Sequence, residues 1–225
     1  MRGSKGSWHS LGRGVCFIIG GLIPFLPLRA LAVPEEIPAA QLEAEAAHAK
    51  ELAEACARST CRTESKELRL KSTTGGEWGI KTQLFPYADN GQIVLYPGET
   101  IAVEFSADGK AMDKPHFLRL IDPAAPMTSS PSNPSAPDRA IMTFEFKQTD
   151  GKPDMMLSIK STLGFVIKYD AHMFVPTKNG TQSIYTSSCP IIAKGGAFET
   201  WPQEIAMIVL HDFRVVSERD GVACN

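Results

Sequence analysis

The stretch "IMTFEFKQTDGKPDMMLSIKS", residues 141–161, decides the fold class of this protein. Met142, Phe144 and Phe146 alternate with polar residues, and a period of two residues indicates a half-buried β-strand. Asp150-Gly151 follows, a pair that favours a hairpin turn, and "DMMLSIKS" then supplies a second strand. The stretch therefore predicts two antiparallel strands joined by a turn.

The same organisation recurs along the chain beyond Arg69. Asx-Gly pairs supply the two positive φ angles of a type I′ turn, and there are five of them, at 90–91, 108–109, 150–151, 179–180 and 220–221. Alternating apolar segments between these turns predict about nine strands, at 78–85, 91–96, 100–106, 116–121, 141–148, 154–161, 165–175, 181–186 and 205–216.

Strands joined by tight turns, without helices between them, indicate an antiparallel sandwich or barrel. We expect one β-sandwich of the immunoglobulin-like kind over residues 71–225, and a single β-barrel is the alternative. The segment 122–138 contains five prolines and almost no large apolar residue, so we expect it to form an extended surface loop of that domain.

The first 32 residues read as a secretory signal peptide. Basic residues and no acid precede an apolar run from Val15 to Ala32, and Ala30-Leu31-Ala32 has the small residues that signal peptidase reads. Prolines and Arg29 interrupt the run, which disfavours a membrane-spanning helix. We expect cleavage after Ala32 and a periplasmic or secreted protein; the alternative is an uncleaved N-terminal membrane anchor.

An Ala-rich helix should follow within the segment 33–70, running from Glu35 to about Arg58 and ending near a Cys-x4-Cys pair. It either lies on its own domain, pinned by Cys56, or projects as a spacer. Residues beyond the leader include four cysteines, an even number that suggests two disulfides in an exported chain. The favoured pairing is Cys56 with Cys61 and Cys189 with Cys224.

Charge and motifs narrow the function classes. Removal of residues 1–32 leaves 19 basic and 25 acidic groups, a net charge of −6. The sequence thus lacks the excess of positive charge that is typical of nucleic-acid-binding proteins. The sequence lacks the common nucleophile, zinc, phosphate-loop, dinucleotide and calcium motifs, so we expect no cofactor.

Three residues are weak candidates for metal binding or acid–base chemistry. His172 and Asp170 share the polar face of one expected strand, where residues two apart lie side by side. His211 falls in register with Val209 and Phe213, so we expect it to be partly buried, with Asp212 pointing to the opposite face. A hydrated sheet face and a hydrogen-bonded core histidine are the simpler interpretations. A metal site becomes testable if His172 and His211 meet.

Residues 187–202 are expected to form a loop, in which Phe198 and Trp201 are candidates for an aromatic ligand ledge or for a plug at one end of the sandwich. Together these observations favour an exported, non-catalytic domain that binds another envelope or secreted protein or acts in an assembly. Its candidate surfaces are an exposed sheet edge, the Pro-rich loop and the Ala-rich helix. A metal-dependent binder or hydrolase that uses His172, Asp170 and His211 is the alternative.

Overall fold

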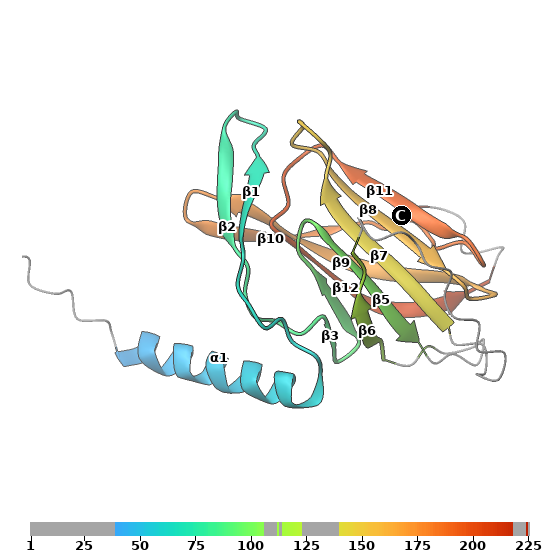
Figure 1. Ribbon diagram of the computed structural model, residues 1–225, viewed down its shortest axis with the longest axis horizontal. Coiled ribbons are helices and arrows are strands. Elements are labelled where there is room, and N and C mark those ends of the chain that lie inside the picture. The colour runs from blue at the N-terminus through green and yellow to red at the C-terminus, as the bar shows by residue number, and fades with distance from the viewer. Residues whose placement is uncertain (1–38, 106–111, 113, 123–139, 218–223, 225) are drawn as a thin grey trace, which may run out of the picture. The chain divides into compact units, whose positions relative to one another are not determined.

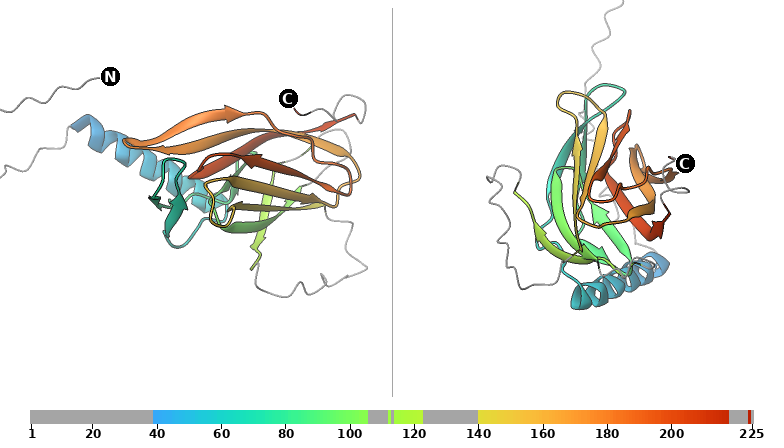
Figure 2. Two further views of the ribbon diagram at one scale, coloured as in Figure 1. Left: turned by 90° about the horizontal axis from the view of Figure 1, so that it is seen from above. Right: turned by 90° about the vertical axis from the view of Figure 1, so that its right-hand side faces the viewer.

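Two five-stranded antiparallel sheets pack face to face in the computed structural model, which describes residues 39–105, 112, 114–122, 140–217 and 224 (Figure 1). The first, here called the β9 sheet, has the order β10-β9-β12-β4-β3, and the second, the β7 sheet, has the order β11-β8-β7-β5-β6. Figure 2 shows them as two layers. The sheets are not closed into a barrel, so the predicted β-sandwich is confirmed and the barrel alternative is wrong.

The strands have the following bounds. The β9 sheet contains β3 (Ala88–Asp89), β4 (Gln92–Leu95), β9 (Val166–Thr177), β10 (Gly180–Thr186) and β12 (Met207–Val216). The β7 sheet contains β5 (Glu99–Phe105), β6 (His116–Leu120), β7 (Ala140–Gln148), β8 (Met155–Ser161) and β11 (Gly196–Trp201). A separate hairpin contains β1 (Glu67–Lys71) and β2 (Glu77–Lys81).

The opening stretch folds as its alternation predicts. It forms β7 and β8, which pair so that Phe144 lies opposite Ile159 and Phe146 opposite Leu157. Phe144 and Phe146 are fully buried between the layers, as are Ile208 and Leu210 from the other sheet. Each such side chain contributes about 1.5–3 kcal/mol through removal of apolar surface from water. The packed inner faces therefore hold the two sheets together.

Three elements differ from the prediction. Residues 196–201 form the edge strand β11 where a loop was expected, and β1 and the two-residue β3 are additional strands. Asn90 and Gly91 have φ angles of 47° and 81°, as a type I′ turn requires. In the pairs 150–151 and 179–180 only the glycine has a positive φ angle. The strand pairing explains this difference, because the two turns consist of residues 149–154 and 178–179 and neither is centred on its Asx-Gly pair as a two-residue turn. The remaining two Asx-Gly pairs lie outside the described residues.

Helix α1 (Ala39–Arg58) ends where the sequence predicts and belongs to the same compact unit as the strands. Arg58 donates two hydrogen bonds to Asp89, of 3.0 and 2.7 Å, and Ala55 is buried. The helix is therefore attached to the sandwich through its C-terminal turns. Within the described part of the chain no helix has the length and apolar character needed to cross a membrane. The expected leader and most of the Pro-rich loop fall outside the described residues.

Both predicted disulfides are present, Cys56–Cys61 and Cys189–Cys224, with Cα–Cα distances of 5.4 and 4.2 Å. The first closes the turn after α1, and the second ties Cys224 to the segment after β10. Disulfides of this kind are typical of proteins that fold in an oxidising compartment.

Candidate functional site

The outer face of the β9 sheet contains all three predicted site residues. Asp170 and His172 lie on β9, on the face opposite the buried Tyr169 and Ala171, and His211 lies beside them on β12. In the ladder His211 pairs with Asp170, and Val209 pairs with His172. The strand order thus brings together side chains that are about forty positions apart in sequence.

A β-bulge in β12 follows directly after His211, which shares the outer face with Met207 and Val209 through the ordinary alternation of the strand. The pairing with β9 shifts by one residue between His211 and Arg214, and Asp212 has a φ angle of 53°. The extra residue turns Phe213 inward, where its ring packs against Tyr169 and Phe105 at centroid distances of 5.8 and 5.0 Å. The predicted shared face of His211 and Phe213 is therefore wrong, because strict alternation does not continue through a bulge.

The predicted orientation of Asp212 is wrong for the same reason. Its Oδ2 lies 2.8 Å from His211 Nδ1, so the neighbour in sequence is the hydrogen-bond partner of this imidazole. The His211 side chain is 20 % exposed, and its Nε2 is a buried atom that has no hydrogen-bond partner among the described residues. The carboxylate accepts a hydrogen bond from Nδ1 and so fixes the orientation of the ring, with Nε2 directed away from Asp212.

Three rings form a row across neighbouring strands, here called the ring row: Tyr185 on β10, His172 on β9 and His211 on β12. The His172 ring is 5.7 Å from Tyr185 in an edge-on arrangement and 5.2 Å from His211, to which it is nearly parallel. Tyr185 is 58 % exposed. The two histidines thus meet along one face, the arrangement that makes a metal site testable.

Asp170 is engaged elsewhere. It accepts two hydrogen bonds of 3.2 Å from the guanidinium of Arg214 and one of 3.5 Å from the Tyr185 hydroxyl. His172 Nδ1 lies 3.5 Å from Ser183 Oγ, at the limit of a hydrogen bond. A catalytic triad would require a carboxylate that orients His172, and Asp170 does not contact its ring nitrogens in this way.

Metal binding at this face would rest on the two imidazoles. In the part of the chain that the structure describes, no three His, Cys, Asp or Glu side chains converge as metal ligands. His172 and His211 are a pair of potential nitrogen ligands, and the contact of Asp212 with His211 resembles the outer-shell carboxylate of many metal-binding histidines.

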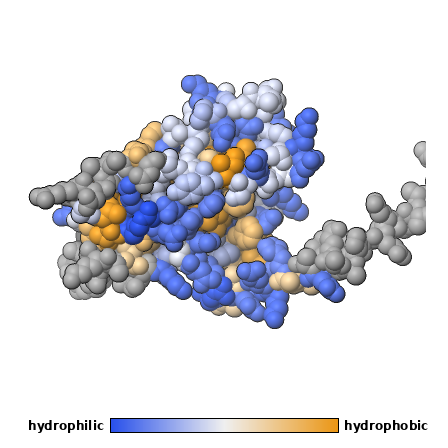
Figure 3. All heavy atoms as spheres, turned by 180° about the vertical axis from the view of Figure 1, so that it is seen from behind, coloured by the Kyte–Doolittle hydropathy of each residue, from blue (hydrophilic) through white to orange (hydrophobic). Residues whose placement is uncertain are grey.

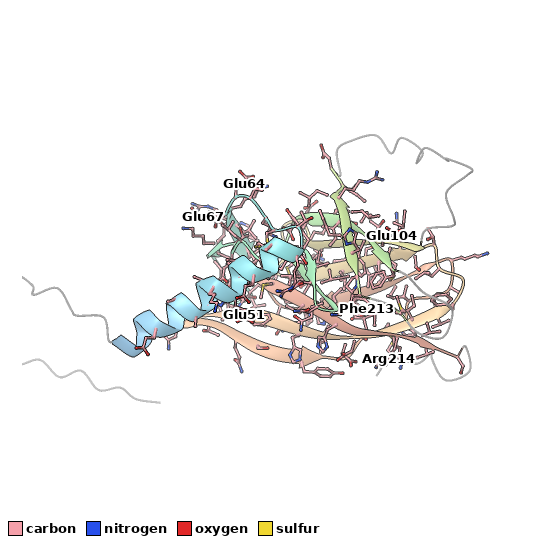
Figure 4. All side chains as sticks on the ribbon, turned by 90° about the horizontal axis from the view of Figure 1, so that it is seen from below. Glu51, Glu64, Glu67, Glu104, Phe213 and Arg214 are labelled. Carbon is pink, nitrogen blue, oxygen red and sulfur yellow. A yellow bond between two sulfur atoms is a disulfide. The ribbon has the colours of Figure 1, made fainter. Side chains whose placement is uncertain are left out.

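A groove of about 410 Å³ lies beside the ring row, between α1 and the outer face of the β9 sheet. We call it the helix groove. Its helix side includes Glu51, whose position on α1 is labelled in Figure 4. The other side is largely apolar, with Phe85, Val94, Phe174, Met207 and Val209. In the space-filling view of Figure 3, apolar surface forms an interrupted band between hydrophilic regions.

The predicted aromatic ledge is divided by the strand that replaces the loop. On β11, Phe198 is 60 % exposed and Trp201 is 9 % exposed, and their positions put them on opposite faces of the strand. The indole N–H of Trp201 donates to Thr186 Oγ1 at 3.0 Å. The two side chains therefore do not form one surface.

Sequence reasoning missed a buried ion pair between Arg62, in the segment after α1, and Glu99, at the start of β5. The guanidinium of Arg62 donates to both Glu99 oxygens, at 2.7 and 2.6 Å, and to the carbonyl oxygens of Phe85 and Val94, both at 2.9 Å. It also lies over the rings of two tyrosines, Tyr87 and Tyr96, at 4.3 and 4.8 Å. The available signal was an arginine beside a disulfide cysteine, which does not identify a partner 37 residues away.

Two buried carboxyl groups were also missed. Glu204 accepts hydrogen bonds from Trp78 Nε1 at 2.8 Å and from Thr73 N–H at 3.1 Å, and so docks the β1–β2 hairpin. Glu199 points into the sandwich, where it accepts from the Tyr169 hydroxyl at 2.5 Å and from Cys189 N–H at 2.8 Å. Burial raises the pKa of Glu199 above its ordinary value, although these two hydrogen bonds act in the opposite direction.

Comparison with protein-family models, curated proteins and solved structures gives no match for this chain. Function therefore rests on the geometry alone.

Proposed function

We propose that this protein is an exported, non-catalytic β-sandwich of the immunoglobulin-like kind that binds another envelope or secreted protein. In this proposal the leader is removed near Ala32, and the mature protein is periplasmic or secreted. The observation that carries the proposal is the outer face of the β9 sheet, where the helix groove adjoins the ring row.

The two outer faces of the sandwich differ in chemistry. On the β7 sheet, Thr143, Glu145 and Lys147 alternate with core residues, and Lys147 forms a 2.6 Å ion pair with Glu145. The centre of this face is therefore stable in water, and its exposed aromatic residue Phe198 lies on the edge strand β11. On the β9 sheet, Phe174, Met207 and Val209 line an open groove. Aromatic residues and Met are enriched in protein interfaces, so this second face is better suited to a protein partner.

The polar groups of the face favour binding over catalysis. Each carboxylate near the ring row has a partner: Asp212 contacts His211, and Asp170 contacts Arg214 and Tyr185. These hydrogen bonds fix the orientation of the side chains, so the surface presents polar groups at fixed positions to a partner. A general base would need to reach a nucleophile or a water molecule instead.

Site-specific photo-crosslinking in the producing cell tests the proposal. A photoreactive phenylalanine analogue at Tyr185 should yield a discrete crosslinked product that contains a second, different protein, and the same analogue at Lys147 on the other outer face should not. Equal labelling from both positions, or none from Tyr185, would contradict the proposal. N-terminal sequencing tests export separately, since a chain that begins at Met1 would support the anchored alternative.

The contact between His172 and His211 supports a second candidate function, a metal-dependent binder or hydrolase that also uses Asp170. Metal analysis of the purified mature protein and of its His172→Ala variant distinguishes it from the first. Stoichiometric metal that disappears on substitution would favour this second function.

A further inference from the structure

The free edge of β10 is a second feature of the β9 sheet. In the ladder, β10 pairs with β9 along all seven of its residues without a register shift. Within the described chain β10 is the outermost strand of its sheet. Its sequence, "GTQSIYT" at residues 180–186, contains no charge and no proline.

The other edge strands of the sandwich carry features that discourage pairing with another chain. β3 has only two residues and contains Asp89, whereas β6 contains Arg119 and its pairing with β5 includes a register shift. β11 has an inward-pointing carboxyl group, Glu199. Short edges, charges and bulges are the usual protections against strand addition, and β10 has none of them.

The hydrogen bonds of β9 establish which backbone groups of β10 point outward. Ile167 exchanges both backbone hydrogen bonds with Ile191, on the β10 side of the strand, while the carbonyl of Phe174 accepts from Ala206 on the β12 side. Backbone direction alternates along a strand, so odd-numbered residues of β9 face β10 and even-numbered residues face β12.

The even-numbered residues of β9 pair with the odd-numbered residues of β10. Thr181 lies opposite Pro176, Ser183 opposite Phe174 and Tyr185 opposite His172. The N–H and C=O groups of these three β10 residues therefore point away from β9, at the regular spacing of a strand edge.

We propose that β10 pairs antiparallel with β10 of a second copy of this chain, about a two-fold axis at Ser183. Ser183 then faces Ser183 of the second copy, and Thr181 faces its Tyr185. Because these are the residues whose backbone groups point outward, this register forms about six interchain N–H···O=C bonds and joins two five-stranded sheets. Each exposed Tyr185 gains a β-branched cross-strand neighbour.

A second copy is favoured as the occupant by this self-complementarity. The two-fold register keeps outer-face residues opposite outer-face residues, and no like charges meet because the strand is uncharged. The pairing is independent of the partner proposed for the helix groove, and either can fail without the other.

Sedimentation of the mature protein from about 1 µM to about 1 mM tests the proposal, and we expect a reversible dimer. Ser183→Pro removes an outward N–H and leaves the β9 ladder intact, so it should weaken dimerisation by at least about tenfold. Ser183→Ala keeps the N–H and should change the dissociation constant by less than about threefold. The melting temperature of each variant establishes that it is folded.

A charge pair tests the register. Ser183→Lys and Ser183→Glu each place two like charges opposite one another, so each variant alone should be mainly monomeric, and an equimolar mixture should recover the dimer. A wild-type chain that stays monomeric throughout would overturn the proposal. So would a dimer that Ser183→Pro leaves unchanged, or a mixture that fails to associate.

Discussion

Replacing Arg62 with leucine should destabilise the protein more than replacing any exposed arginine. Arg62 is 5 % exposed, and its guanidinium satisfies both oxygens of Glu99 and two backbone carbonyls. Leucine fills part of the volume but donates nothing. The substitution therefore leaves the Glu99 carboxylate in a largely buried position without its cation.

The magnitude follows from that stranded charge. Removing one partner of a buried ion pair costs about 3–5 kcal/mol, much of it from the uncompensated partner. For a domain of this size, about 1 kcal/mol lowers the melting temperature by about 2–4 °C, so we expect a decrease on the order of 10 °C. Arg62→Lys should recover only part of the loss, because an ammonium group cannot form the bidentate contact.

Urea denaturation of the mature protein with its disulfides intact measures the effect, and Arg69→Leu is the matched control. Arg69 is 73 % exposed and contacts Glu67 and Glu77 only at 3.9 and 4.0 Å. Such surface pairs contribute about 0–1 kcal/mol. If Arg62→Leu and Arg69→Leu destabilise equally, the buried pair stabilises the protein no more than a surface contact does.

Three further substitutions, the first with a matched control, test the interior. Gly196→Ala should prevent normal docking of β11 and lower the melting temperature, because the new Cβ would overlap the carbonyl oxygen of Ile159. The control Gly164→Ala should be tolerated, because its Cβ would meet only Lys194 Cε at 3.8 Å. Equal melting temperatures of the two variants would count against a close approach of Gly196 to Ile159. Glu199 has a raised folded-state pKa, so its contribution should make the protein less stable as pH rises from the ordinary carboxyl pKa through the folded value. Glu199→Gln should make the stability depend less on pH, which denaturation at a series of pH values would measure. If the stability of wild type and variant changed with pH in the same way, Glu199 would not have the raised pKa. For Glu204, burial raises the pKa but hydrogen bonds from its own N–H and from Trp78 outweigh it, so the folded-state pKa is lowered. The stabilisation from the Glu204 carboxylate should be complete above the ordinary carboxyl pKa and lost as pH falls through the folded-state pKa. The difference in the free energy of unfolding between wild type and Glu204→Gln, measured by Trp78 fluorescence, should therefore become smaller in acid. A difference that becomes larger in acid would contradict this prediction.

Much of the fold could be predicted because alternation is a local property. The alternation of Met142, Phe144 and Phe146 identified a core strand, and all three side chains are fully buried between the sheets. The disulfide pairing was also predictable, since Cys56 and Cys61 are close enough in sequence to meet in a turn. The remaining pair then followed.

The candidate site was predictable only in part. His172, Asp170 and His211 were identified, and they do lie on one face, but their contacts depend on a bulge. Whether Asp212 is accommodated as an extra residue is determined by the strand that lies opposite, and that strand begins more than forty positions earlier. Strict alternation consequently placed Phe213 on the wrong face.

The sequence by itself determined the period of the strands, the end of the Ala-rich helix and the cysteine pairs, because each depends on residues that are near in the chain or few in number. Only the tertiary structure decided that Arg62 pairs with Glu99, that Glu199 is buried and that β10 is an edge. These properties depend on which distant segments pack together, and an edge strand and a central strand of similar composition satisfy the same local preferences.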